Sequence, residues 1–353
     1  MEKAVRGRLL RFLRTHLHDN IDFAEPLRPL TGGAFSQVFQ FSLSGTSGPW
    51  SGPLVLRLYP AETLPMQPRL EEAFQDCLAR TGFPTPRVLL TQGDPDALGQ
   101  MFMIVQRLPG RSFLRGIRPV DFVRDFPRLF LAWPRTAARL LARLHASDTS
   151  AVLESAATLN IPESALSTGR HLRDIEHRLS EFGELGLKDG LDWLRANQPA
   201  LPSVLSIVHG DLWPGNVLMC RDQVTGVVDW DRAAVGDPAL DVGFAKAGLA
   251  LMPAPFPPPA PFNQGVNAAG RHIANRLHRA YEELHPIAGG RVRYFEALRS
   301  FLELSIVAQF RARRSRGVDL RGPRPPWDGG VTPLTIHFAH VTGVELRLPG
   351  ARP

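Results

Sequence analysis

Asp211, Asn216 and Asp229 have the side-chain types and the spacing that a metal ion and a proton acceptor require. Asp211 and Asn216 belong to the stretch 209–216, which reads His-Gly-Asp-Leu-Trp-Pro-Gly-Asn. Mg²⁺ prefers hard oxygen ligands and takes only one or two of them from protein. Asn216 and Asp229 can fill that role, which leaves Asp211 to accept the proton of an attacking hydroxyl. Such a division of roles suits phosphoryl transfer, which needs little beyond positioning and charge neutralisation.

The predicted elements around these residues bring them together. A short apolar strand over 204–208 leads into the loop, and Asn216 opens a second strand over 217–220. A turn then returns the chain through 227–231, which carries Asp229. Because antiparallel pairing places the start of one strand beside the end of the next, Asn216 and Asp229 are expected to lie close in space.

The first hundred or so residues predict a small antiparallel sheet with one helix. Apolar residues one turn apart near the N-terminus indicate a docking helix within residues 1–20, namely Val5, Leu9, Leu13 and Leu17. Aromatic and β-branched residues between turn signals predict strands over 35–43, 54–59, 88–90 and 101–106. A stripe at helical spacing predicts a helix over 66–81.

Beyond Pro109 the pattern is mostly helical. Helices are predicted over 137–145, 176–182, 190–198, 239–251, 271–285, 291–314 and 334–341. The proline-dense stretch 252–262 cannot be helical and is interpreted as a stiff extended connection.

The motif His-x-Asp-x-x-x-x-Asn, followed by an Asp at the end of a hairpin, resembles the catalytic and metal-binding motifs of protein kinases. Gly210, the Trp-Pro-Gly before Asn216 and the stretch 236–241 (Gly-Asp-Pro-Ala-Leu-Asp) look more like the aminoglycoside phosphotransferase and choline kinase family. The resemblance covers roughly residues 25–310. It implies an α+β, bilobal, protein-kinase-like fold, with a nucleotide-binding lobe over 1–108 and a larger, mainly helical catalytic and acceptor-binding lobe over 109–353.

By this resemblance Asp211 is the catalytic base, and Asn216 and Asp229 bind Mg²⁺. Asp231 is a rival to Asp229 as metal ligand. His209 is expected to be a packed histidine. Asp237 is interpreted as a helix N-cap, and Asp241 is expected to brace the catalytic loop.

The resemblance also implies which N-terminal residues bind the nucleotide: Gly32, Gly33, Ser36, Arg57, Glu72, Val105 and Arg107. The glycine loop would let backbone N–H groups approach phosphates. Arg57 stands where protein kinases have a lysine, paired with Glu72 or its neighbour Glu71, and can grip two phosphate oxygens. Backbone groups around Val105–Arg107 would bind the base.

The implied function is transfer of a phosphoryl group from ATP or GTP, with Mg²⁺, to a hydroxyl of a small molecule, either an antibiotic or a metabolite. The alternative is a non-catalytic nucleotide-binding protein on the kinase fold. No Ala-Pro-Glu follows Asp229 and no room is left for an activation segment, which favours a small acceptor over a protein. The stretch 252–314 has few acids and many arginines, which favours a neutral, apolar or anionic alcohol over a polycationic aminoglycoside.

Composition is that of a soluble globular protein, with 44% hydrophobic and 21% charged residues and no apolar run long enough to span a membrane. The two cysteines suit a reducing cytoplasm, although the Arg-rich N-terminus leaves a mitochondrial presequence open. The net charge of +7 is spread along the chain, and no motif supports nucleic-acid binding. The oligomeric state is left open.

Overall fold

The computed structural model describes residues 2–18, 20–30, 37–61, 63–114, 119–183, 186–251, 262–317, 325, 327–328 and 331–346. Side chains are described throughout these ranges except at 2–4, 119–123, 262–264 and 266–267. The chain divides into two compact units, one of residues 1–111, 150–163 and 217–231, and one of residues 112–149, 164–216 and 232–353. The single boundary that the sequence suggested, between 108 and 109, stays a prediction.

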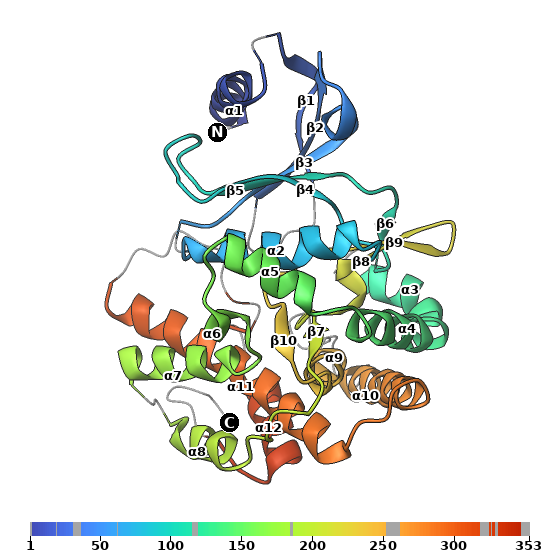
Figure 1. The fold of residues 1–353 in the computed structure, drawn as a ribbon. Coiled ribbons are helices and arrows are strands. Elements are labelled where there is room, and N and C mark those ends of the chain that lie inside the picture. Colours follow the sequence, from blue (N-terminus) through green and yellow to red (C-terminus); the bar gives the residue numbers. More distant parts are fainter. Residues whose placement is uncertain are drawn as a thin grey trace. The chain divides into compact units, whose positions relative to one another are not determined.

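The first unit is built on a five-stranded antiparallel sheet of order β1-β2-β3-β5-β4 (Figure 1). Its strands are β1 (Asp22–Pro29), β2 (Gln37–Ser44), β3 (Leu54–Leu58), β4 (Val88–Gln92) and β5 (Phe102–Gln106). Successive side chains of a strand point to opposite faces. In β3 this alternation buries Leu56 and Leu58 in one core and places Arg57 on the other face of the sheet.

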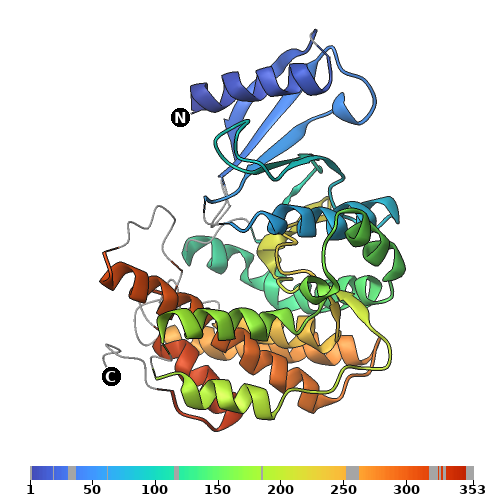
Figure 2. The same ribbon diagram turned by 60° about the vertical axis from the view of Figure 1, so that its left-hand side comes forward.

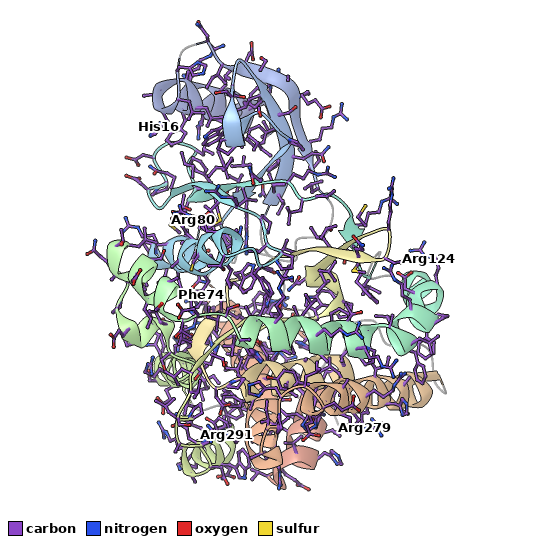
Figure 3. All side chains as sticks on the ribbon, turned by 45° about the vertical axis from the view of Figure 1, so that its right-hand side comes forward. His16, Phe74, Arg80, Arg124, Arg279 and Arg291 are labelled. Atoms are coloured by element: carbon purple, nitrogen blue, oxygen red, sulfur yellow. The ribbon has the colours of Figure 1, made fainter. Side chains whose placement is uncertain are left out.

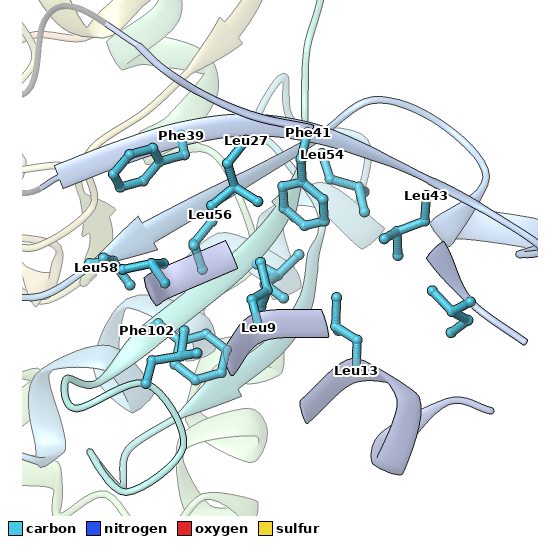
Figure 4. Packing of buried hydrophobic residues seen from close by; sticks show 14 residues of the cluster. Leu9, Leu13, Leu27, Phe39, Phe41, Leu43, Leu54, Leu56, Leu58 and Phe102 are labelled. Carbon is cyan, nitrogen blue, oxygen red and sulfur yellow. The ribbon is translucent and has the colours of Figure 1, made fainter. Parts of the chain in front are cut away.

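One face of the sheet is covered by α1 (Glu2–His16), as Figure 4 shows at close range. Val5, Leu9 and Leu13 of this helix are buried against side chains of the sheet that include Phe41 and Phe102. The predicted N-terminal docking helix is therefore confirmed.

The other face carries Arg57, with Tyr59 just beyond the end of β3. Helix α2 (Met66–Arg80) follows and buries Glu71 and Phe74, the latter labelled in Figure 3. Helix α5 (Ser150–Thr158) packs on α2. The unit also contains the antiparallel hairpin of β8 (Val217–Cys220) and β9 (Gln223–Val227). The two-residue strand β6 (Arg111–Ser112) spans the division between the units.

The second unit is mainly helical. Its helices are α3 (Pro119–Leu131), α4 (Trp133–His145), α6 (Glu163–Leu166), α7 (Arg170–Phe182), α8 (Lys188–Ala196), α9 (Ala239–Leu251), α10 (Phe262–Glu282), α11 (Gly289–Ser315) and α12 (Thr332–Thr342). The almost wholly apolar α9 packs against both α10 and α11, and α7 runs beside α11 (Figures 1 and 2). The short strands β7 (Ser206–Val208) and β10 (Ala234–Gly236) pair antiparallel. Among the helices that the structure describes, none has the length and apolar character that a bilayer crossing requires.

The α+β fold class is confirmed, with an antiparallel sheet in one unit and a mostly helical remainder in the other. The sequence pattern did not predict α3 or α5, and it began α10 at 271 instead of 262. The strand expected over 227–231 ends earlier, at Val227, so Asp229 lies beyond the hairpin. The proline-dense loop lies mostly outside the described residues.

Candidate active site

Asp211 lies in a loop whose backbone is held by a buried carboxylate. The loop leaves β7 and ends in the short 3₁₀ helix η2 (Pro214–Asn216). Asp241, in the first turn of α9, accepts hydrogen bonds from the N–H of His209 at 2.8 Å and from the N–H of Gly210 at 2.6 Å. Gly210 has a φ of 74°, and a Cβ there would lie 2.5 Å from the carbonyl oxygen of Arg232, so glycine is required. These contacts agree with the bracing role predicted for Asp241.

Asp241 is itself fixed by a buried chain of hydrogen bonds. The Nε2 of His145 lies 3.0 Å from Asp241 Oδ2, and its Nδ1 lies 2.6 Å from the hydroxyl of Tyr281. The side chains of His145 and Asp241 have no exposed surface. A histidine on an apolar helix face gives no sign in the sequence of the partner that it contacts. The place of His145 in α4, opposite α9, makes it part of the support for the loop.

The carboxylate of Asp211 is held from two sides within the second unit. The Nδ2 of Asn216 lies 3.3 Å from its Oδ2 and donates to the Asp211 carbonyl at 3.0 Å. The Nη2 of Arg299, in α11, lies 3.0 Å from its Oδ1 and 3.2 Å from Glu303 Oε1. The Asp211 side chain keeps 21% of its surface exposed, so the carboxylate is open to solvent on one side.

Opposing influences set the proton affinity of Asp211. Burial raises the pKa of this carboxyl, but the positive charges of Arg299 and Arg232, with His209, more than offset it and bring the pKa below its usual value. Asp211 is therefore ionised at neutral pH, which is the state in which a general base can accept a proton.

Replacing Arg299 with methionine is expected to shift the acid limb of the pH profile of kcat/KM upward by about one pH unit or more. With Asp211 as the predicted base, this limb is expected to follow the pKa of the Asp211 carboxyl. Without the Arg299 guanidinium, less positive charge offsets the effect of burial, so the pKa of Asp211 rises. Steady-state rates across pH test this, with Arg293→Met on the same helix as control, because Arg293 binds the carbonyl of Val341 instead. If the acid limb of the kcat/KM profile stayed at the same pH in Arg299→Met, a group other than Asp211 would determine its position.

In the first unit, Arg57 joins two carboxylates. Its Nη1 lies 2.6 Å from Glu71 Oε2, and its Nη2 lies 2.9 Å from Asp229 Oδ1. The helix partner of Arg57 is thus Glu71, and the assignment to Glu72 is corrected. Neighbouring residues on a helix point about 100° apart, so only one of them can face the sheet. Glu71 is fully buried, whereas Glu72 is only partly buried, and this partial burial raises the pKa of Glu72.

Burial raises the pKa of Glu71 to about 8, although the positive charge of Arg57 acts to lower this pKa. The hydroxyl of Tyr59 also donates to Glu71 Oε2, at 3.2 Å. These contacts fix the position of the Arg57 guanidinium, whose Nη2 donates a hydrogen bond to Asp229. Asp229 has a φ of 71°, a left-handed conformation that is uncommon for a residue with a side chain.

Asn216 and Asp229 each offer an oxygen suited to a divalent cation. The Nδ2 of Asn216 donates hydrogen bonds to Asp211, and no described residue donates to the Oδ1 of Asn216. The Oδ1 of Asp229 accepts a hydrogen bond from Arg57, whereas its Oδ2 accepts none within the described part of the chain. The Asp229 side chain is 41% exposed. Asp231 accepts a bond from Gln67 through its backbone oxygen, at 2.6 Å. The donor chemistry of Asn216 and Asp229 therefore fits Mg²⁺.

Two backbone N–H groups of the predicted base-binding segment, residues 105–107, already form hydrogen bonds within the protein. The N–H of Gln106 donates to the carbonyl of Arg87 at 3.0 Å, and the N–H of Arg107 donates to that of Pro53 at 2.9 Å. Val105 lies within β5, opposite Val55 and Val88. A nucleotide base would have to use carbonyl oxygens or side chains here, so the assignment of Val105 and Arg107 stays a prediction. Gly32, Gly33 and Ser36 lie outside the described residues.

Sequence reasoning missed Arg299, Glu303 and Arg232. The guanidinium of Arg232 lies 3.2 Å from Glu303 Oε1, which also faces Arg299. Only the spacing of Arg299 and Glu303, one helical turn apart, could have drawn attention to the pair. The sequence gives no sign that this turn faces Asp211, because the contact depends on how α11 packs.

Comparisons with known proteins agree with the fold and with the family resemblance. The chain is 26% identical to homoserine kinase of Methylocella silvestris over 298 residues, which cover 80% of this chain and 78% of that protein. It is 27% identical over 181 residues to the probable acyl-CoA dehydrogenase IBR3 of Arabidopsis thaliana, covering 47% of this chain and 20% of the relative. The chain thus matches about a fifth of that longer protein.

Among solved structures, a thermostable mutant of aminoglycoside phosphotransferase APH(4)-Ia, in ternary complex with AMP-PNP and hygromycin B, has a similar fold. The TM-score is 0.59 at 17% identity, covering 95% of this chain and 99% of that one. The model of the phosphotransferase enzyme family matches residues 26–287, which is more than half of the chain. The resemblance seen in the sequence is confirmed, and the chain belongs to the phosphotransferase enzyme family.

Proposed function

We propose that this protein is a small-molecule kinase that transfers the γ-phosphoryl group of ATP or GTP to an alcohol. The observation that carries the proposal is the ionised Asp211 carboxylate, held by Asn216 and Arg299 in a braced loop and still exposed on one side. A similar fold is known in ternary complex with AMP-PNP and hygromycin B, and a relative is named a homoserine kinase.

In the proposed reaction Asp211 accepts the proton of the acceptor hydroxyl as its oxygen attacks the γ-phosphorus. The bond from that phosphorus to the β,γ-bridging oxygen breaks, giving a phosphate monoester and ADP or GDP. Asn216 and Asp229 would hold Mg²⁺, which when bound neutralises charge on the phosphates. Arg57 would bind phosphate oxygens with its fixed fork of N–H groups.

Replacing Arg57 with methionine is expected to raise the KM for the nucleotide about tenfold or more, which corresponds to about 1.4 kcal/mol. The guanidinium donates to phosphate and also holds Asp229, so both functions are lost. Arg57→Lys keeps one charge and is expected to restore part of the affinity. Arg69→Met, an exposed residue of α2, is the control. An unchanged KM in a folded Arg57→Met protein would mean that the phosphates are held elsewhere.

The proposal is tested by a screen of purified protein with ATP or GTP, Mg²⁺ and alcohols of different charge. Aminoglycosides, macrolides, choline, homoserine and sugar alcohols form the panel, with ADP or GDP release as the readout. Acceptor-dependent release that Asp211→Asn loses supports the proposal. Absence of Mg²⁺-dependent nucleotide binding would contradict it. Nucleotide binding with no transfer to any alcohol would favour a non-catalytic binding protein.

A further inference from the structure

A buried tyrosine of α10 is linked through a histidine to the carboxylate that holds the loop of Asp211. The Nδ1 of His145 lies 2.6 Å from the Tyr281 hydroxyl oxygen, and its Nε2 lies 3.0 Å from Asp241 Oδ2. All three side chains are buried. Helix α10, which carries Tyr281 in its last turn, packs against both α4 and α9 (Figure 1). The linkage therefore joins one residue from each of three packed helices.

The Asp241 carboxylate determines which nitrogen of the His145 ring carries a proton. A carboxylate can only accept hydrogen bonds. Asp241 already accepts from the backbone N–H groups of His209 and Gly210, and the third group that faces it is the Nε2 of His145. That nitrogen must carry a hydrogen, because a bare lone pair would face a negative oxygen. A neutral imidazole has one N–H only, so its Nδ1 is then an acceptor.

The hydroxyl of Tyr281 supplies the proton that such an Nδ1 accepts. Burial and the negative charges of Asp241 and Asp237 raise the pKa of Tyr281, so its hydroxyl keeps its proton and can donate it. The hydrogen bond made by one imidazole nitrogen determines the protonation of the other. Without the hydroxyl, the proton of His145 could move to Nδ1, and the lone pair of Nε2 would then point at Asp241.

The ring and the hydroxyl of Tyr281 contribute separately. The ring meets that of His145 edge-on, with 5.5 Å between the centroids, and stacks with that of His285 at 5.9 Å. A phenylalanine at this position would keep both ring contacts. A buried hydroxyl is costly unless it is hydrogen-bonded, and the structure gives this one a short bond to His145. The hydroxyl therefore needs an explanation other than packing.

We propose, resting on the phosphotransferase activity above, that Tyr281 is a positioning residue for that reaction. Its hydroxyl donates to Nδ1 of His145 and confines the ring proton to Nε2, which donates to Asp241. Asp241 in turn holds the N–H groups of His209 and Gly210, the two residues that precede Asp211. Tyr281 thus acts on the direction of the Asp211 carboxylate without touching the reacting atoms.

Tyr281→Phe is expected to lower kcat about tenfold or more, with less than about a twofold change in the KM for the nucleotide, because a displaced general base affects the chemical step. Tyr294→Phe is the matched control. Tyr294 is a buried tyrosine of α11 that packs on Trp193 and Phe295, and loss of its hydroxyl is expected to leave kcat unchanged. A hydroxyl with a structural role alone would lower the urea midpoint of unfolding and leave kcat as it is.

A double-mutant cycle tests whether Tyr281 acts through His145. The side-chain nitrogen of glutamine carries its hydrogens regardless of its neighbours, so a donor toward Asp241 in His145→Gln needs no help from a hydroxyl. In the His145→Gln background, Tyr281→Phe is expected to change kcat by less than about twofold. An equal loss of kcat in both backgrounds would overturn the route through His145.

Nitrogen NMR of the protein labelled with ¹⁵N-histidine reports the tautomer without depending on turnover. The His145 signals are identified by their absence in His145→Gln. The wild-type protein is expected to show a protonated Nε2 and an unprotonated Nδ1, and Tyr281→Phe is expected to shift the Nδ1 signal toward the protonated form. A protonated Nδ1 in the wild-type protein would overturn the inference.

The outcomes separate this inference from the proposed function. A kcat of Tyr281→Phe equal to that of Tyr294→Phe, in a wild-type protein that does phosphorylate an alcohol, would keep the kinase and overturn the role of Tyr281. Absence of transfer by the wild-type protein to every alcohol of the panel would contradict the kinase proposal instead. The nitrogen signals would in that case still show whether Tyr281 holds His145 in the inferred tautomer.

Discussion

Replacing Asp211 with asparagine is expected to lower kcat by about 10²–10⁴-fold, while the affinity for nucleotide changes little. The amide occupies the same space and can still face Asn216 and Arg299, but it cannot accept the hydroxyl proton. Steady-state assays with the best acceptor give kcat and KM, and fluorescence titration gives the nucleotide affinity.

Asp174→Asn provides the control for this change. Asp174 is an exposed carboxylate of α7 whose charge acts on Arg178, and its loss is expected to change kcat by less than about twofold. Turnover by Asp211→Asn at the wild-type rate would remove Asp211 from the role of base. A rate lost together with nucleotide binding would instead indicate a folding defect.

Replacing Asp241 with alanine is expected to lower the free energy of unfolding by about 3–5 kcal/mol. The change leaves the N–H groups of His209 and Gly210, together with the buried Nε2 of His145, without the acceptor that they share. A buried polar group that loses its partner costs the full penalty of its desolvation. Activity is expected to fall as well, because the same bonds position Asp211.

Urea denaturation followed by circular dichroism measures this loss. Asp192→Ala on α8 is a matched control, because its ion pair with Lys188 is exposed. The control is expected to change the free energy of unfolding by less than about 1 kcal/mol. A similarly small change in Asp241→Ala would show that the loop is held by other contacts and that Asp241 is not its brace.

The fold was predicted well where hydrophobic patterns are strong. The helical stripe of Val5, Leu9 and Leu13 predicted a helix packed on the sheet, because burial of one face is a local property of the sequence. Helix α3 was missed, since Pro127 lies inside it and proline is the strongest helix-breaking signal. Helix α5 was missed because it has few buried residues, and these are too few to produce a recognisable helical repeat of apolar positions.

The site was predictable where one motif carries it and unpredictable where tertiary packing decides. Asp211, Asn216 and Asp241 lie in a short, recognisable segment, and the structure joins Asp211 to Asn216 and Asp241 to the loop. Choosing between Glu71 and Glu72 requires the rotation of α2, which the sequence leaves open. The contact of Arg299 with Asp211 joins residues 88 positions apart and depends on the packing of α11.

The central claim is that this protein transfers phosphoryl groups to an alcohol with Asp211 as the base. ³¹P nuclear magnetic resonance tests it directly, by following the γ-phosphoryl signal of ATP or GTP in the presence of Mg²⁺ and each acceptor of the panel. The wild-type protein is expected to convert that signal into a phosphate monoester, and Asp211→Asn is expected to leave it in the nucleotide. Inorganic phosphate as the only product for every acceptor, or an equal ester yield from both proteins, would contradict the claim.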